Sequence, residues 1–117
     1  MLLLRSGIAL AVLTAALACS EAAPESAAAD PAVARGRTVY LSACTACHNG
    51  DPTKDGSVGP ANAGASRELL EAKILRGSYP PGYTPKRESA MMPPMPQLAG
   101  SIDDLAVFLA AAAQQAP

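Results

Sequence analysis

The sequence is poor in aromatic residues, and this limits what can fill the interior of the protein. Its 117 residues include no tryptophan, one phenylalanine and three tyrosines. A domain of this size buries only a modest fraction of its surface, and it often needs a disulfide, a metal or a cofactor for stability. We therefore expect a non-protein group to occupy part of the interior.

The chain also lacks an excess of charge of either sign. Nine lysine and arginine residues oppose ten aspartate and glutamate residues, so the formal net charge is −1. A nucleic-acid-binding domain usually carries a basic stripe, so this composition argues against nucleic acid as a partner. Histidine occurs once and cysteine three times, at Cys19, Cys44 and Cys47. The candidates for metal or cofactor chemistry are therefore few.

Residues 1–18 are expected to be a signal peptide. A short basic start is followed by an apolar run, residues 6–17, that is too short to span a bilayer comfortably as a permanent helix. Ala16 and Ala18 satisfy the small-residue rule for cleavage after Ala18. We therefore expect the mature protein to work in the periplasm, where disulfides and exported cofactors are normal.

Cleavage at this point leaves Cys19 as the first residue, in a context that resembles a bacterial lipoprotein processing site. A lipidated Cys19 would tether the protein to a membrane, and the alternative is a soluble exported protein in which Cys19 is incidental. Residues 19–30 are small and polar without a hydrophobic period, which indicates a flexible tether. Residues 31–117 follow as the predicted domain.

The domain is predicted to be all-α. Asp30 and Ser66 are N-cap residues, Pro31 suits a first helical position, and Gly77 suits a helix end. These signals and the hydrophobic period predict helices at residues 31–47, 67–76 and 101–113. The connecting segments are rich in turn residues and proline, and none has the pattern of a strand. We expect three helices joined by long, stiff loops.

The motif C-T-A-C-H, formed by Cys44, Cys47 and His48, carries the chemistry. A thioredoxin-like pair would open a helix after a strand, whereas this pair follows a helix. A structural zinc site needs four nitrogen or sulfur ligands, and the chain is one short. The remaining interpretation is c-type haem attachment, for which C-x-x-C-H is specific. Two thiols at this spacing can bond the two vinyl groups of a porphyrin, and the adjacent imidazole can bind the iron.

With this motif the chain resembles the class I c-type cytochromes, over about residues 31–113. Gly36, Tyr40 and Cys44 match the run G-x-x-x-[FY]-x-x-x-C that family members show before the haem motif. In the family the glycine lets the first and last helices cross closely against an aromatic residue, for which Phe108 is the candidate. The resemblance implies a small cytochrome c fold, with three or more helices around one covalently bound haem c.

Gly59-Pro60 matches the G-P pair of the same family. The resemblance implies that the Pro60 carbonyl accepts a hydrogen bond from the second ring nitrogen of His48. Such a bond fixes the tautomer of the imidazole and makes the ligating nitrogen more basic. Asn62 departs from the pattern, because the family usually has leucine there, so one wall of the haem pocket is expected to differ.

A low-spin electron carrier needs a second axial ligand, and methionine is the natural choice in a chain with one histidine. Both Met92-Pro93 and Met95-Pro96 match the M-P pair of the family. The spacing to the aromatic residue of the last helix in short bacterial members, counted back from Phe108, falls on Met92. We therefore predict His48 and Met92 as the iron ligands, with Met95 and then Met91 as the alternatives. Hydroxyl and charged groups in the same loop could reach the haem propionates, or form an exposed polar turn: Tyr79, Tyr83, Lys86 and Arg87.

The resemblance implies an electron carrier, not an enzyme, that cycles one haem iron between Fe(III) and Fe(II) and meets redox protein partners. One alternative is a haem enzyme or gas sensor with a labile sixth ligand, which a readily displaced methionine would reveal. Another is a cytochrome subunit docked on a larger dehydrogenase, which co-purification would reveal.

Overall fold

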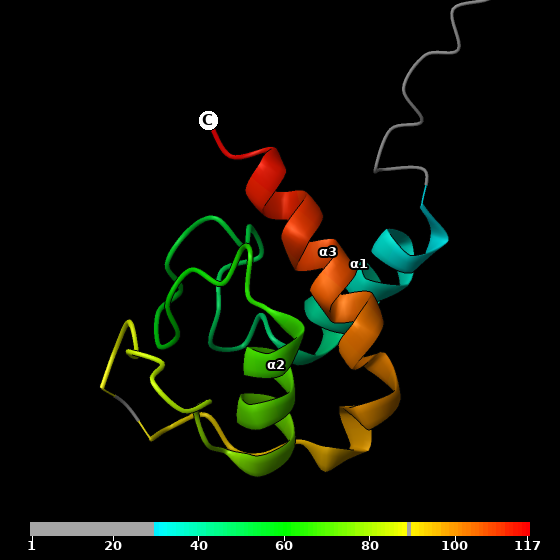
Figure 1. Ribbon diagram of the computed structural model, residues 1–117. Helices are drawn as coiled ribbons and strands as arrows, with labels where there is room; N and C mark the ends of the chain where they lie inside the picture. Colours follow the sequence, from blue (N-terminus) through cyan, green and yellow to red (C-terminus); the bar gives the residue numbers. More distant parts are fainter. Residues whose placement is uncertain (1–29, 89) are drawn as a thin grey trace, which may run out of the picture.

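The computed structural model describes residues 30–88 and 90–117, and these residues form the all-α fold that the sequence predicts (Figure 1). Within them no strand is present, and no helix is both long and apolar enough to cross a membrane. The predicted signal peptide, Cys19 and the tether up to residue 29 lie outside the described residues. The elements are α1 (Pro31–Ala43), α2 (Arg67–Leu70), the π-helix η2 (Glu71–Leu75), the 3₁₀-helix η3 (Pro96–Ser101) and α3 (Ile102–Gln114).

Helix α1 begins where the sequence predicts and ends four residues earlier. The Asp30 carboxylate accepts a hydrogen bond from the Ala32 N–H at 2.8 Å, as an N-cap should. The expected continuation to Cys47 was wrong, because the helix ends at Ala43. Beyond it the backbone N–H groups of Cys47 and His48 both donate to the Cys44 carbonyl, at 3.2 and 2.9 Å. The Cys47 bond spans three residues instead of four, and residues 44–47 form a turn.

The second predicted helix changes its hydrogen-bond pattern halfway. The Ser66 hydroxyl accepts from the Leu69 N–H at 3.2 Å and caps α2, as predicted. After Leu70 the chain continues as η2, a π-turn that the sequence did not reveal. Gly77 ends the element with φ +65°, the left-handed conformation that favours glycine at a helix end.

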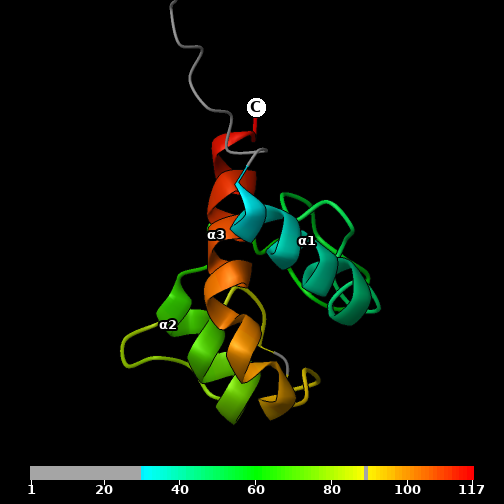
Figure 2. The same cartoon turned by 90° about the vertical axis from the view of Figure 1, so that its right-hand side faces the viewer.

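Helices α1 and α3 cross each other (Figures 1 and 2). Gly36 lies at the crossing, as the resemblance implied. A Cβ added to this buried glycine would overlap the Asp104 carbonyl and would lie 2.7 Å from the Phe108 Cβ. Beside the crossing, the rings of Tyr40 and Phe108 pack with centroids 5.4 Å apart and planes tilted by 49°. The missing side chain at Gly36 thus brings the two helices together.

The polypeptide core lies where α1 and α3 meet α2 and η2. Tyr40, Leu105 and Leu109 are almost fully buried there, and Leu70 and Ile74 come from the second helix. On the outside Arg35 binds both carboxylate oxygens of Asp104, at 2.8 and 2.9 Å, and orients α1 on α3. The loops at residues 49–65 and 79–95 extend from the other side of this core (Figure 1).

Candidate haem site

A cavity of about 590 Å³ lies between the helices and the two long loops. Cofactor sites have volumes of about 300–1,000 Å³ and are lined mainly by apolar groups with a few polar ones. One wall is apolar and comes from α2, η2 and α3, with Leu69, Leu70, Ile74, Leu105 and Leu109. The group that the sequence predicts therefore has a place of suitable size and lining.

The Cys44–His48 turn brings the whole C-x-x-C-H motif to one cavity, because Cys44, Cys47 and His48 all line it. Burial raises the pKa of the Cys44 thiol to about 11, so this thiol is uncharged. Redox-active and metal-bound cysteines instead need a thiolate. Nowhere in residues 30–88 and 90–117 do three histidine, cysteine, aspartate or glutamate side chains gather as a metal site. The described residues therefore do not supply the four ligands of a structural zinc site, and thioether attachment remains the interpretation of the motif.

The imidazole of His48 is held by a backbone carbonyl. Its Nδ1 lies 2.8 Å from the Pro60 oxygen, as the resemblance implied. A carbonyl only accepts hydrogen bonds, so Nδ1 carries the proton and donates it. Nε2 is then left with a free lone pair, which is the form of histidine that binds a metal.

Two glycines give this imidazole its room. A Cβ at the buried Gly59 would lie 2.6 Å from Nδ1 and 2.7 Å from Nε2 of His48. A Cβ at Gly56 would lie 2.6 Å from the His48 Cα. Contacts below 3.0 Å do not occur for real Cβ atoms, so alanine at either position would displace the histidine or its backbone. The loop after the motif is thus shaped around the ring.

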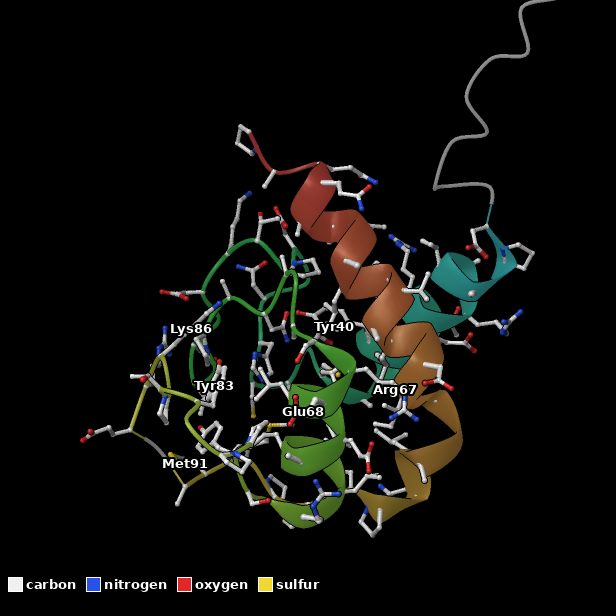
Figure 3. The ribbon with its side chains drawn as sticks, in the orientation of Figure 1. Tyr40, Arg67, Glu68, Tyr83, Lys86 and Met91 are labelled. Carbon is white, nitrogen blue, oxygen red and sulfur yellow. The ribbon has the colours of Figure 1, made fainter. Side chains whose placement is uncertain are left out.

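Met92 and Met95 both line the cavity, and both pack against the hydrophobic core. Met91 does not line it and has 71 % of its surface exposed. Figure 3 shows Met91 at the outer edge of the molecule, on the loop that leads to η3. The backbone N–H of Met95 donates to the Ile74 carbonyl at 2.6 Å, which fixes this segment on η2. The structure therefore brings the predicted ligand Met92 and its first alternative to the same cavity as His48.

The charged side chains that line the cavity are all cations, namely Lys73, Lys86 and Arg87. Lys86 Nζ donates to the Ala61 carbonyl and Arg87 Nη1 to the Val58 carbonyl, both at 2.8 Å. These bonds connect the loop of Figure 3 that carries Tyr83 and Lys86 to the loop that holds His48. A cationic rim of this kind can bind carboxylates such as haem propionates.

Tyr79 and Tyr83, the two tyrosine candidates for contact with the haem propionates, are on the same rim of the cavity. Tyr79 and Tyr83 line the cavity and stack with ring centroids 5.4 Å apart and an interplanar angle of 11°. Lys73 Nζ lies 4.3 Å from the centroid of the Tyr79 ring, a cation–π contact. This stack gives residues 79–83 a defined shape at the mouth of the cavity.

Tyr40 connects α1 to the loop after the motif. Its hydroxyl donates to the Asn49 carbonyl at 2.6 Å and lies 3.2 Å from Oδ1 of Asn62. Asn62, which replaces the usual leucine of the family, also lines the cavity, and its backbone N–H donates to the Pro52 carbonyl at 2.9 Å. The departure from the pattern thus places a polar side chain in the wall and partners it with Tyr40.

A Tyr40→Phe variant is expected to lower the free energy of unfolding by about 1 kcal/mol, because one buried hydrogen bond is lost. For a domain of this size the thermal midpoint should fall by about 4–8 °C. Thermal unfolding followed by circular dichroism measures the change. Tyr79→Phe, which removes a hydroxyl from an exposed ring, is the control and should melt like the parent protein.

The Tyr40→Phe variant should also change how the stability of the protein depends on pH. Burial raises the pKa of Tyr40 above its ordinary value of 10.0. The folded protein therefore favours the neutral phenol of Tyr40. The stability that comes from this preference is fully present below pH 10 and is lost as the pH rises through the raised pKa. Tyr40→Phe should flatten the alkaline loss of stability, and an unchanged slope would contradict the assignment.

Comparison with known proteins agrees with the geometry. A family model described as cytochrome c matches residues 33–112. The chain therefore belongs to the cytochrome c family, and it has the small cytochrome c fold of class I members. The family binds haem c covalently through cysteines and uses it for electron transfer. No curated protein and no solved structure matches the chain in the corresponding searches.

Several residues that shape the site were not singled out by sequence reasoning. Gly56 carries no sequence signal, because only the folded loop brings it against His48. Gly59 stood in the G-P pair, but only Pro60 was given a role. The bond between Met95 and Ile74 joins two segments that are distant in the sequence, and the amphipathic pattern gives no indication of it or of the π-turn.

Proposed function

We propose that this protein is a periplasmic electron carrier with one haem c ligated by His48 and Met92. The observation that carries the proposal is the protonated Nδ1 of His48 on the Pro60 carbonyl, in a cavity that both motif cysteines and a methionine also line. An imidazole held in this tautomer presents Nε2 as a ligand. Histidine and methionine together give a closed iron site and a raised reduction potential.

Different residues of the chain would attach the haem, bind its iron and hold its propionates. Cys44 and Cys47 would hold the haem by thioether bonds, and His48 and Met92 would bind its iron. The haem supplies the one-electron Fe(III)/Fe(II) couple. The apolar wall excludes water, and the low dielectric around the iron contributes to the potential. Lys86 and Arg87 would hold the propionates at the rim, because both line the cavity.

An electron carrier fits this cavity better than an enzyme does. General acid–base catalysis needs a positioned side chain that can exchange a proton with the substrate. No aspartate or glutamate is among the described residues that line the cavity, and its histidine is assigned to the iron. The second candidate function, a sensor or enzyme with a labile sixth ligand, requires the cavity methionine to leave the iron readily.

The position of the start of helix α1 supports a membrane tether through lipidated Cys19. Helix α1 begins on the opposite side of the molecule from the loop at residues 79–88, as Figure 1 shows. A tether that ends at Asp30 would leave the cavity mouth open to redox protein partners. Donor and acceptor would then meet the same exposed rim in turn.

The visible and near-infrared spectra of the exported, haem-loaded protein test the proposal. We expect sharp bands in the reduced state and a weak near-infrared sulfur-to-iron band in the oxidised state. Met92→Ala should abolish the near-infrared band, because it removes the sixth ligand.

Met95→Ala is the matched control, because this side chain lines the same cavity and should leave the band in place. Loss of the band only in Met95→Ala would move the ligand to Met95. A denatured protein with no covalently attached tetrapyrrole would refute the proposal as a whole.

A further inference from the structure

The C-terminal turn of the second helix touches the methionine segment at two points. The carbonyl of Ile74, in η2, accepts a hydrogen bond of 2.6 Å from the Met95 N–H. Three residues later, Gly77 faces the ring of Pro94, which stands between the two candidate ligands. One short turn thus contacts the segment that carries both Met92 and Met95.

The Ile74 carbonyl lies in the last turn of the second helix, where carbonyls have no partner within the helix. In a continuous α-helix this carbonyl would accept a hydrogen bond from the N–H of residue 78. Here the Ser78 N–H donates instead to the Ala72 carbonyl, at 3.1 Å, and the Gly77 N–H donates to the Lys73 carbonyl, also at 3.1 Å. The Ile74 carbonyl is therefore left for a partner outside the helix, and the Met95 N–H is that partner. Single π-turns within helices occur frequently at functional sites.

Gly77 provides the second contact for two reasons. Its φ of +65° ends the helix and turns the chain away. A Cβ at this position would lie 3.0 Å from Pro94 Cγ and 3.6 Å from Pro94 Cδ, a contact tighter than nearly all real ones. Pro94 itself is exposed, so burial does not hold its ring in place. The absence of a side chain at Gly77 lets the ring lie directly against the helix end.

We propose that Ile74 and Gly77 are positioning residues that hold the methionine ligand at the cavity. The inference rests on the proposed His/Met ligation. A thioether is a weak ligand, so the fraction of time its sulfur occupies the binding position depends on how firmly the backbone is held. Loosening the segment lowers that fraction, and an external ligand that competes for the same position then binds more tightly.

Gly77→Ala and Gly82→Ala form a matched pair for the test on the haem-loaded protein. Both glycines have positive φ, +65° and +76°, so alanine strains the backbone at either position. Only Gly77 has a neighbour, since nothing lies within 4 Å of a Cβ at Gly82. Imidazole is the probe, titrated by visible absorption, and the near-infrared sulfur-to-iron band is recorded beside it.

We expect Gly77→Ala to raise the apparent affinity for imidazole by about tenfold, the lower end of the effect of altering groups that orient a metal ligand. The near-infrared band should weaken in the same variant. Gly82→Ala should change neither, although the thermal midpoint of both variants should fall. Equal imidazole affinities in the two variants would overturn the proposal, because a general loss of stability would then explain both.

Gly77→Asn is a second test variant, to be used if Gly77→Ala does not fold. Asparagine adopts positive φ more readily than alanine does, yet it still places a Cβ against Pro94. It should reproduce the gain in imidazole affinity, and parent-like affinity in a folded Gly77→Asn variant would overturn the proposal.

If the proposed methionine ligation of the iron is wrong, the experiment gives a different result. The parent protein would then lack the near-infrared band, and neither Met92→Ala nor Met95→Ala would alter its affinity for imidazole. That outcome overturns both the proposed ligation and the positioning role. A parent protein with the band and an unresponsive Gly77→Ala variant overturns the positioning role alone.

Discussion

Replacing Gly59 with alanine is expected to weaken the proposed bond between His48 and the haem iron by about 10–100-fold, which corresponds to about 1.4–2.8 kcal/mol. The new Cβ would lie 2.6 Å from Nδ1 and 2.7 Å from Nε2 of the imidazole, so the ring must move. Movement of the ring breaks the bond between Nδ1 and the Pro60 carbonyl, now 2.8 Å long. The imidazole then loses both its orientation and its fixed tautomer.

A guanidinium titration of the haem-loaded protein, followed at the haem absorption band, measures this loss as a lower midpoint. Gly50→Ala is the control in the same loop, because a Cβ there would have no neighbour within 4 Å. The control should unfold like the parent protein. A Gly59→Ala variant with a parent-like midpoint would show that the ring can shift without consequence, and the role given to Pro60 would be wrong.

Replacing Gly36 with alanine is expected to destabilise the protein by about 3 kcal/mol, the upper part of the usual range for overpacking. At an exposed site in a helix, alanine would instead stabilise by about 1 kcal/mol relative to glycine. At Gly36 the new methyl group would overlap the Asp104 carbonyl and crowd Phe108. The backbone cannot rotate away as a side chain can, so α1 must separate from α3.

Thermal unfolding measures this effect, with an expected fall of about 12–24 °C in the midpoint. Gly100→Ala is the control, since Gly100 lies in η3 and a Cβ there would have no neighbour within 4 Å. A fall in the thermal midpoint of Gly36→Ala indicates overpacking at the helix crossing, and a rise indicates the usual preference of a helix for alanine. A Gly36→Ala variant more stable than the parent would show that the helices have room to adjust.

Features governed by a few consecutive residues could be predicted from the sequence. The caps at Asp30 and Ser66 depend on side chains beside the groups that they bind, and both lie where predicted. The cysteines and histidine of the motif are close in the chain, so any local turn brings them to one cavity. The crossing at Gly36 was predicted from the family pattern, which records a contact that no local rule contains.

Features that depend on the folded chain could not be predicted. After Ala43 the chain turns, with the N–H groups of Cys47 and His48 both on the Cys44 carbonyl, and the hydrophobic period does not register this arrangement. The π-turn of η2 is stabilised in part by Met95, which lies far along the chain. The bonds from Lys86 and Arg87 to the preceding loop join residues more than twenty positions apart. Each depends on tertiary contacts.

The distribution of buried contacts has a consequence for the maturation of the protein. Tyr40, Leu105 and Leu109 are buried by polypeptide alone, whereas the 49–65 and 79–95 loops face each other across the cavity. The bonds from Lys86 to Ala61 and from Arg87 to Val58 join the two loops, and a haem in the cavity would add packing surface to both. Attachment of the haem is therefore expected to make both loops more resistant to proteases.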